Sequence, residues 1–325
     1  MITLKIGIDD SGGRLDRLLR KSLPLTKLSD IYRLVRTGRI RINGKKAKQD
    51  YRLRENDTLE MDIDQSELPK KNTSATDALV NLAGTDFFKR NLNIIFEDED
   101  LIACNKPPNL VVHPGTGHSA HDTLIDIVKS YVLTNKKGNK TGEPMLVHRI
   151  DRDTSGIVLI AKNKSILRYL HSHFRDHQIE KKYSAVCHGR PPKKSGVIEV
   201  KLAKTLERNS GTKVTVDENG QIAKTRYSVI RSNGVFTEFD VGIGTGRTHQ
   251  IRVHLAHIGC PVVGDVRYGD KDLDKALFMR RNISRRLYLH AYLISFIHPL
   301  DNKRLTLTAP VPDEFAELMK STEDM

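Results

Sequence analysis

Residues 147–156 read VHRIDRDTSG, a polar stretch between two short apolar runs. The run before it ends with MLV at residues 145–147, and the run after it is IVLIA at residues 157–161. Both runs are rich in β-branched residues, which is typical of buried strands. The polar stretch is therefore predicted to be a loop held on a rigid sheet, a place where functional side chains are common.

This loop carries a carboxylate between two arginines. Asp151 lies next to Arg152 and two residues after Arg149, and such neighbours favour the ionised form of an aspartate. An ionised and positioned carboxylate can act as a nucleophile or as a base. The same residues also fit a salt-bridged turn in which residues 153–155 supply turn or cap hydrogen bonds. Local chemistry leaves both interpretations open.

Four segments of the chain carry a pattern that is far more specific than the loop alone. In order, they are NKPPNLVVHP (residues 105–114), HRIDRDTSG (148–156), EKKYSA (180–185) and GTGRTHQIRVHL (244–255). Together they resemble the RluA-type pseudouridine synthases, from about residue 92 to about residue 312, with one small departure at Ile150, where the family usually has leucine. The resemblance implies an enzyme that isomerises uridine to pseudouridine in RNA, without a metal or another cofactor.

The region of the resemblance is predicted to have an α+β fold, the pseudouridine synthase fold, with a mixed, mainly antiparallel sheet. Runs that look like strands outnumber single helical connectors, which favours antiparallel pairing. Strands are predicted at residues 92–96, 101–104, 182–186 and 235–241. Helices are predicted at residues 122–132, 166–174 and 247–257, the last ending at Gly259.

The resemblance also implies three catalytic residues. Asp151 is the implied nucleophile, with Asp153 as its rival, and the sequence leaves open whether the carboxylate attacks the sugar, attacks the base or deprotonates the sugar. Tyr183 is implied to stack on the target base and to assist proton transfer, although a lone tyrosine is more often a packing residue. Arg252 is implied to pair with the catalytic aspartate, a role that suits a planar guanidinium. Arg247 is the second candidate for that pairing, and a phosphate contact is the alternative role for Arg252.

RNA contacts are predicted around the same loop. A uracil inside a duplex must be flipped out before an enzyme can reach it. The resemblance implies that Arg149 enters the gap that the flipped base leaves, and a simple phosphate contact is the alternative. Further contacts with RNA are predicted for Arg152, Arg247, Gln250 and Lys106.

The charge of the chain supports a polyanionic partner. The 325 residues include 54 Lys and Arg against 40 Asp and Glu, a formal net charge of +14. An excess of this kind favours nucleic acid as the partner, especially where it is concentrated. Residues 27–48 contain eight Lys or Arg and one acidic residue, Asp30.

Residues 1–64 are predicted to form a small N-terminal α/β domain. Apolar residues at helical spacing indicate two helices, and the alternation of residues 39–42 before the Asn43-Gly44 pair indicates a hairpin. This order resembles the RNA-binding domain of the ribosomal-protein S-four type, with an ordinary charged helix face as the alternative. Phosphate contacts are predicted for Lys27, Arg33, Arg36, Arg39 and Arg41. Residues 65–90 are mostly polar and are predicted to be a linker, which leaves residues 91–325 as the catalytic domain.

Several other classes are disfavoured. The three cysteines are far apart and form no Cys-x-x-Cys pair, so neither a disulfide framework nor a cysteine zinc site is expected. Three histidines, His249, His254 and His257, fan around one predicted helix rather than converge, so no metal site is expected. The glycine-rich residues 242–246 lack a nucleotide-binding fingerprint. Neither a signal-peptide core nor a membrane-spanning run is found, which predicts a cytoplasmic location.

The sequence is therefore interpreted as that of a cytoplasmic RNA pseudouridine synthase, expected to be a monomer. Residues 147–162, 264–274 and 286–291 resemble family members that modify 23S rRNA, so 23S rRNA or its large-subunit precursor is the predicted partner and substrate. One alternative is a non-catalytic RNA-binding factor for ribosome assembly, which would bind RNA equally well with Asp151 replaced. Another is a metal-dependent phosphoesterase, which would lose activity in the presence of a chelator.

Overall fold

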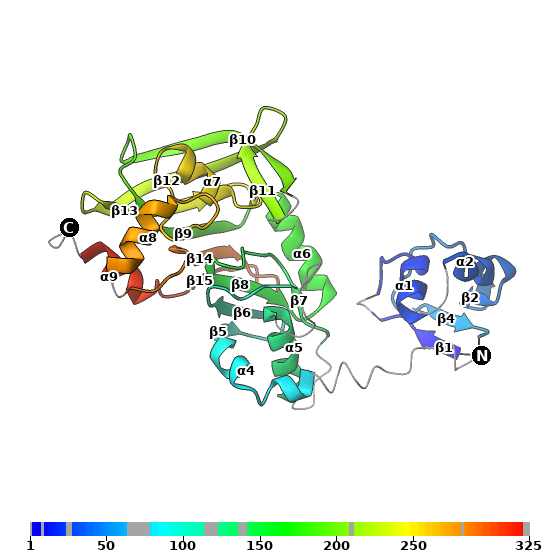
Figure 1. The fold of residues 1–325 in the computed structure, drawn as a ribbon. Coiled ribbons are helices and arrows are strands. Elements are labelled where there is room, and N and C mark those ends of the chain that lie inside the picture. The colour runs from blue at the N-terminus through cyan, green and yellow to red at the C-terminus, as the bar shows by residue number, and fades with distance from the viewer. Residues whose placement is uncertain are drawn as a thin grey trace.

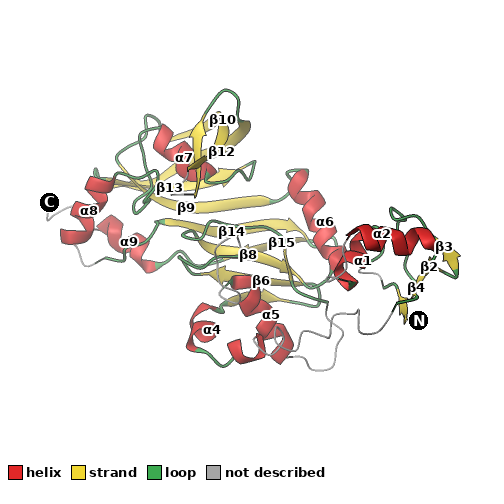
Figure 2. Cartoon of the chain, turned by 45° about the vertical axis from the view of Figure 1, so that its right-hand side comes forward, coloured by secondary structure: helices red, strands yellow, loops and turns green. Residues whose placement is uncertain are grey.

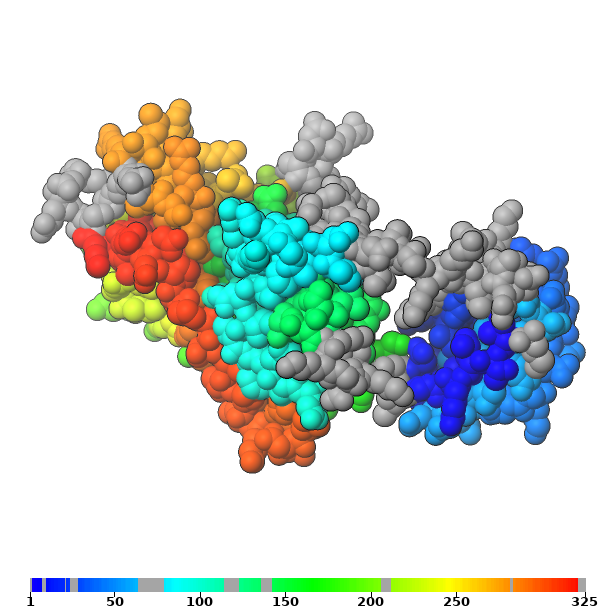
Figure 3. Space-filling model, turned by 90° about the horizontal axis from the view of Figure 1, so that it is seen from below, coloured from blue at the N-terminus to red at the C-terminus, as the bar shows by residue number. Residues whose placement is uncertain are grey.

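The computed structural model describes residues 2–7, 10–23, 28–63, 79–113, 123–135, 142–207, 211–280 and 283–320. These residues form a small N-terminal module and a larger C-terminal domain (Figure 1). The space-filling view shows the module, in blue, as a lobe beside the larger domain (Figure 3).

The N-terminal module packs two helices against a small sheet. Its elements are β1 (Ile2–Lys5), α1 (Leu15–Ser22), α2 (Leu28–Thr37), β2 (Ile40–Ile42), β3 (Lys45–Lys46) and β4 (Thr58–Met61). Among the described residues the strands pair antiparallel in the order β1-β4-β2-β3. Asn43 and Gly44 adopt positive φ angles of 52° and 72° in the turn between β2 and β3, as an Asn-Gly hairpin requires. The predicted two helices and small sheet are confirmed.

The C-terminal domain is built on one long mixed sheet. Across the described ranges its strands lie in the order β11-β10-β12-β13-β9-β14-β8-β6-β5, with β15 paired to β14 and β7 paired to β8. Their bounds are β5 (Ile94–Glu97), β6 (Leu101–Lys106), β7 (Met145–Leu146), β8 (Ser155–Ala161), β9 (Glu180–His188), β10 (Ser195–Glu207), β11 (Gly211–Val216), β12 (Gln221–Ser232), β13 (Phe236–Ile243), β14 (Leu289–Ile297) and β15 (Arg304–Thr308). Only β14 and β8 pair in parallel among these strands, so the predicted α+β fold with a mainly antiparallel sheet is confirmed.

Helices flank this sheet (Figure 2). They are α4 (Asp86–Asn91), α5 (Leu124–Thr134), α6 (Lys164–Arg175), α7 (Gln250–His257), α8 (Lys271–Arg280) and α9 (Asp313–Lys320). The three predicted helices are present with shifted ends. Thr123 caps α5 and Asn163 caps α6, each by accepting a backbone hydrogen bond, whereas Asp122 lies outside the described residues. Helix α7 begins later than predicted because His249 adopts the left-handed conformation, with φ 54°.

Strand β8, which follows the polar loop, is buried on both faces. Leu159 belongs to the apolar cluster that includes Leu170 of α6, whereas Val158 and Ile160 belong to the cluster that includes Ile127 of α5. Alternate residues of a strand point to opposite faces, so β8 lies between two layers of apolar side chains. This burial gives the loop before β8 a rigid base.

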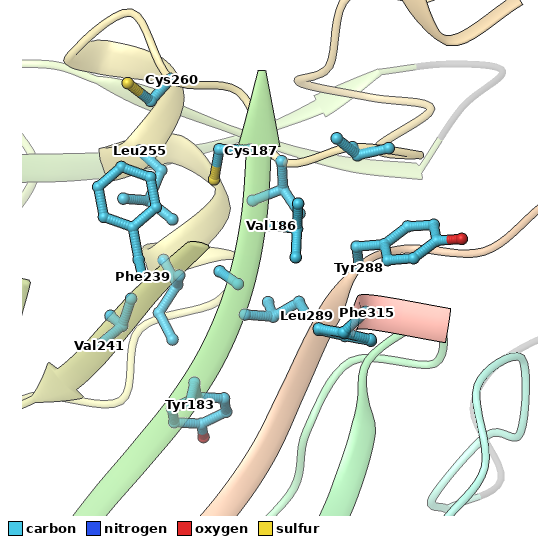
Figure 4. Close-up of a cluster of buried hydrophobic side chains, with 14 of the residues drawn as sticks. Tyr183, Val186, Cys187, Phe239, Val241, Leu255, Cys260, Tyr288, Leu289 and Phe315 are labelled. Carbon is cyan, nitrogen blue, oxygen red and sulfur yellow. The ribbon is translucent and has the colours of Figure 1, made fainter. Parts of the chain in front are cut away.

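A third cluster surrounds β9 and the strands beside it (Figure 4). It brings Phe239 of β13, Leu255 of α7 and Phe315 of α9 together with Tyr183 of β9, and all four side chains are buried. Helix α7 therefore packs in the same cluster as β9, the strand that carries Tyr183. The core thus fixes two of the four sequence segments relative to each other.

The predicted linker at residues 65–90 is wrong at its C-terminal end. Residues 79–82 are helical, and Phe87 and Phe88 of α4 pack with Leu79 and Leu82 against the cluster of α5. These four apolar side chains bury against the sheet domain, so this segment belongs to that domain. Residues 64–78 lie outside the described residues.

Candidate active site

The polar loop is anchored at both ends. Gly156, the second residue of β8, has φ 114°, and a Cβ there would overlap the backbone oxygen of Ala291 in β14. Only glycine allows this close approach of the two parallel strands. At the other end, Nε2 of the partly buried His148 accepts a hydrogen bond from the backbone N–H of Leu159 at 3.1 Å. Burial lowers the pKa of His148 to about 3, so the ring is neutral and can accept.

Lys106 holds the middle of the polar loop through hydrogen bonds to backbone oxygens. Its Nζ donates to the backbone oxygens of Pro107, Leu110 and Arg152, at 2.8, 2.8 and 2.7 Å. The side chain is fully buried, and this burial lowers the pKa of Lys106 to about 7. The prediction that Lys106 contacts RNA is therefore wrong: the ammonium group is inside the protein, where it ties the first motif to the loop.

Asp151 meets a cation from a distant part of the chain. Nη1 of Arg252 donates to Oδ2 of Asp151 at 3.0 Å, and the two residues are 101 positions apart in sequence. The Arg252 side chain is 5% exposed and that of Asp151 is 27% exposed, so Asp151 remains open to a ligand. Of the two arginines that the sequence offered, Arg252 rather than Arg247 pairs with Asp151. The rival carboxylate, Asp153, instead binds the Nε of Arg152 at 2.7 Å.

A second carboxylate, which sequence reasoning missed, holds Arg252 in place. Asp265 accepts hydrogen bonds from Nε and Nη2 of Arg252, both at 2.7 Å, and its side chain is fully buried. Its Oδ1 also accepts from the backbone N–H groups of Arg267 and Tyr268. Burial works to raise the pKa of Asp265, but Arg252 and these N–H groups lower it below the ordinary value. The buried pair is therefore ionised.

Tyr268 follows Asp265 by three residues and contacts two residues that lie beside Asp151. Its ring centroid lies 5.1 Å from Cζ of Arg252, and its hydroxyl lies 2.8 Å from Nδ1 of His249. The hydroxyl also accepts the backbone N–H of Val214 at 2.9 Å. In a neutral imidazole one ring nitrogen carries the proton and the other accepts. The second ring nitrogen, Nε2, lies 3.9 Å from Oδ2 of Asp151. Burial lowers the pKa of His249, which favours this neutral form.

Tyr183 lies at the same site. The side chain is 8% exposed, and burial, followed by the charge of Asp151, raises the pKa of its hydroxyl above the ordinary value. Tyr183 and Asp151 together line two adjoining cavities. The phenol is therefore protonated and positioned beside the carboxylate.

The larger of these cavities, called the catalytic cavity below, has a volume of about 560 Å³. This size lies in the range of small-molecule sites. Its described charged lining comprises one carboxylate, Asp151, and the cationic residues Arg149, Arg152, Arg175, Lys181 and Arg247. A cavity with this balance attracts an anionic ligand and places it against Asp151.

Gln250 is the second residue whose predicted contact with RNA is wrong. It is 3% exposed, and its Oε1 accepts from the hydroxyl of Thr245 and from the backbone N–H of Arg247, at 2.7 and 3.1 Å. Its Nε2 donates to the backbone oxygen of Lys224 and to the hydroxyl of Thr225, both at 3.0 Å. Gln250 thus shapes the glycine-rich turn from inside and has no polar group left for RNA.

The basic residues of the N-terminal module lie at its surface. Arg33, Arg36, Arg39 and Arg41 are exposed. Arg33 and Arg39 form ion pairs with Asp30 and Asp62, at 3.2 and 3.5 Å, whereas Lys27 lies outside the described residues.

The structure also describes features that bear on other classes of protein. The three cysteines are free and buried. Within the described ranges, no group of three or more His, Cys, Asp or Glu residues could hold a metal ion. No helix in the described part of the chain is long and apolar enough to cross a membrane.

Comparison with known proteins identifies the family of the chain. The family model for RNA pseudouridylate synthase matches residues 100–257, and the model for the S4 domain matches residues 13–59. The ribosomal large subunit pseudouridine synthase C of Buchnera aphidicola subsp. Schizaphis graminum is 36% identical over 310 residues, which cover 95% of this chain and 93% of that protein. The protein of the same name from Haemophilus influenzae is 34% identical and covers 99% and 95%. The chain therefore belongs to the RNA pseudouridylate synthase family, as its four motifs predicted, and it is an isomerase.

Solved structures show the same fold. Human RNA pseudouridylate synthase domain containing 4 matches with a TM-score of 0.56 and 24% identity, over 74% of this chain and 94% of that one. Human RNA pseudouridylate synthase domain containing 1 matches with a TM-score of 0.54 and 21% identity, over 72% and 97%. At these identities the likeness concerns the fold of the C-terminal domain.

Proposed function

We propose that this enzyme isomerises uridines of large-subunit rRNA to pseudouridine, with Asp151 as the reacting carboxylate. The support for the substrate is the shared name of the relatives, which align with nearly the whole chain. The support for the residue is one observation: Asp151 is a partly exposed carboxylate, paired with the buried Arg252, in the wall of a cationic cavity.

The geometry suits the proposed roles of Asp151, Arg252 and Tyr183. Pseudouridine formation breaks the N-glycosidic bond, turns the uracil and joins it to the sugar through a ring carbon. Asp151 is open to the cavity and can reach the sugar or the base, while Arg252 holds its other side. Tyr183 keeps its proton and offers an aromatic face beside Asp151, a combination suited to stacking on a base and to proton transfer.

RNA binding is assigned to exposed cations in two places. Arg149 and Arg247 line the catalytic cavity, where Arg149 can enter the gap left by a flipped base and Arg247 can bind phosphate. Arg152, with a side chain 58% exposed, lies at the rim. The S4 domain adds Arg33, Arg36, Arg39 and Arg41, and its tethering raises the local concentration of RNA. We place the enzyme in the cytoplasm, as a monomer.

The test is a map of pseudouridine in 23S rRNA from cells with and without the gene. One or more positions should lose the modification in the deletion strain and regain it when the wild-type gene is restored. The purified enzyme should modify the same positions in transcribed 23S rRNA, with equal rates in buffer and in a metal chelator. An unchanged map in the deletion strain would reject this substrate.

A non-catalytic role in ribosome assembly is not favoured, because such a factor needs neither the pair of Asp151 and Arg252 nor the buried carboxylate that holds it. The two roles differ in one result. An assembly factor would support growth and RNA binding equally well when Asp151 is changed to asparagine.

A further inference from the structure

A second cavity adjoins the catalytic cavity. Its volume is about 590 Å³, and it shares His177, Lys181, Ile243 and Gly244 with the catalytic cavity. These four shared residues form the wall at which the two cavities adjoin. The part beyond this wall is called the flank groove below. Its lining includes Lys182, Lys224, Arg226, Gly242 and Arg304, together with the carboxylates of Glu180 and Asp240.

The floor of the flank groove is bare backbone. A Cβ placed on Gly242 would have no atom within 4 Å, and the nearest atom to a Cβ on Gly244 would be 4.0 Å away. Neither glycine is among the residues with positive φ, so the backbone at both positions is open to other residues. The packing of the protein therefore does not require glycine here. The missing side chains leave room for something to lie close to the strand.

Cationic residues flank Gly242 on both neighbouring strands. Gly242 of β13 pairs in register with Arg226 of β12 and with Lys182 of β9. Residues directly opposite each other on neighbouring strands lie on the same face of the sheet. Arg226 is exposed, whereas its chain neighbours Thr225 and Tyr227 are buried, so this is the outer face. The glycine is thus a gap between two positive side chains.

Two of the cations in the groove have no carboxylate partner among the described residues. Lys182 lies 3.6 Å from Asp240, and Lys224 lies 2.8 Å from Glu199. In the described part of the chain no carboxylate lies within ion-pair distance of Arg226 or Arg304. Arg304 makes a hydrogen bond of 3.4 Å to the hydroxyl of Ser295. Both guanidinium groups are therefore available to an anion.

We propose that the flank groove binds the RNA strand next to the target uridine, with backbone phosphates on Arg226 and Arg304. This inference rests on the proposed function, because it takes the target base to lie beside Asp151. A nucleotide held there is still joined to its neighbours, and the strand has to leave through an opening that is continuous with the cavity. Guanidinium groups bind phosphate with strong, directional hydrogen bonds, and a backbone floor accepts any base. The competing interpretation is that these cations form a solvated basic surface that does not bind RNA.

The first test compares two variants of the full-length enzyme. The double variant Arg226→Ala with Arg304→Ala removes both proposed phosphate contacts. The control is Lys303→Ala, since Lys303 is 84% exposed and lines neither cavity. The substrate is a transcribed 23S rRNA fragment in which wild-type enzyme has mapped the modified uridine, and KM and kcat are measured over a range of salt concentrations.

We expect KM to rise roughly three- to tenfold in the double variant, as for exposed charge contacts. The logarithmic salt dependence should become shallower by about 0.7 for each lost contact with a single strand. Lys303→Ala should behave as the wild type. Equal KM and equal salt dependence in the double variant and the control would overturn the groove, while activity of the wild type on the same RNA would leave the proposed function standing.

A second test fills the floor without changing charge. Gly242→Val puts a side chain into the flank groove at a strand position that β-branched residues favour. We expect a melting temperature equal to that of the wild type and a raised KM. A third measurement needs no variant: 4-thiouridine placed next to the target uridine should photo-crosslink to the peptide of residues 221–232 of β12. Crosslinks confined to peptides outside the flank groove would contradict the proposal, whatever the stability of Gly242→Val.

Discussion

Asp265 and Arg252 form a buried two-pronged ion pair, with both hydrogen bonds at 2.7 Å, and this pair leaves one nitrogen of the guanidinium for Asp151 at 3.0 Å. A planar guanidinium can serve two carboxylates on different edges at once. The fully buried Asp265 fixes the plane, and the plane aims Nη1 at the partly exposed Asp151. The position of Asp151 thus depends on a second carboxylate that does not line the catalytic cavity.

Changing Arg252 to lysine should keep the charge and lose this geometry. A single ammonium group cannot span Asp265 and Asp151 as the guanidinium does. We expect turnover at saturating RNA to fall about tenfold to a thousandfold, equivalent to about 1.4 to 4 kcal/mol in the barrier. Arg247→Ala is the control, and it should mainly raise KM. If Arg247→Ala abolished turnover and Arg252→Lys did not, the pairing would not matter for catalysis.

Changing Asp265 to asparagine should destabilise the fold in a manner that depends on pH. Loss of one partner of a buried ion pair costs about 3 to 5 kcal/mol. The folded-state pKa of Asp265 is lowered from its ordinary value of 3.8, so its stabilisation is complete above that pH. It is lost as the pH falls through the folded-state pKa.

The measurement is the free energy of unfolding of wild type and Asp265→Asn between pH 7 and pH 3, from denaturant titrations. This gap, the difference between the unfolding free energies of the two proteins, should be constant down to about pH 4 and become smaller below it. A gap that widens as the pH falls would contradict an ionised Asp265 in the folded protein.

Much of this site could be predicted from the sequence because the decisive residues sit in motifs with fixed spacing. The loop with Asp151, the strand with Tyr183 and the helix with Arg252 were all predicted, and the structure brings them together at one cavity. Their catalytic roles stay predictions. The apolar runs on each side of the loop were sufficient to predict β8, since burial on both faces leaves a continuous hydrophobic stretch.

Other features could not be predicted, for physical reasons. The role of Asp265 depends on a contact between a loop and a helix, and no local pattern encodes it. Lys106 and Gln250 were predicted to contact RNA, but each is buried where backbone or side-chain groups satisfy its hydrogen bonds. The long strands β10 and β12 were missed because apolar residues also lie on their exposed face, which weakens the apolar alternation. These residues are Val197, Ile222 and Ile230.

Changing Lys106 to methionine should lower stability rather than weaken RNA binding. Three carbonyl oxygens lose their common donor, and the one of Leu110 is buried. An unsatisfied buried group costs about 1 to 3 kcal/mol. We expect a large drop in melting temperature and a lower kcat from a looser loop. The salt dependence of RNA binding, measured by filter binding, should stay that of the wild type. A shallower salt dependence with unchanged stability would instead support the predicted contact of Lys106 with RNA.

The S4 domain should contribute affinity and no chemistry. Replacement of Arg33, Arg36 and Arg41 by alanine removes three exposed cations. If all three contact phosphate, the logarithmic salt dependence of binding should become shallower by roughly 2 to 3 in total, while turnover at saturating RNA stays within about twofold. Lys5→Ala on the edge strand β1 is the control. The role would be wrong if the triple variant bound rRNA as tightly as the wild type at every salt concentration.

The decisive variant for the proposed role of Asp151 as the reacting carboxylate is Asp151→Asn. The amide has almost the shape of the carboxylate, so RNA binding and melting temperature should remain close to those of the wild type. The measurement is pseudouridine formed in transcribed 23S rRNA by purified Asp151→Asn, with Asp153→Asn in parallel. We predict no detectable pseudouridine from Asp151→Asn and substantial activity from Asp153→Asn, whose carboxylate pairs with Arg152. Turnover by Asp151→Asn at the wild-type rate would contradict the account.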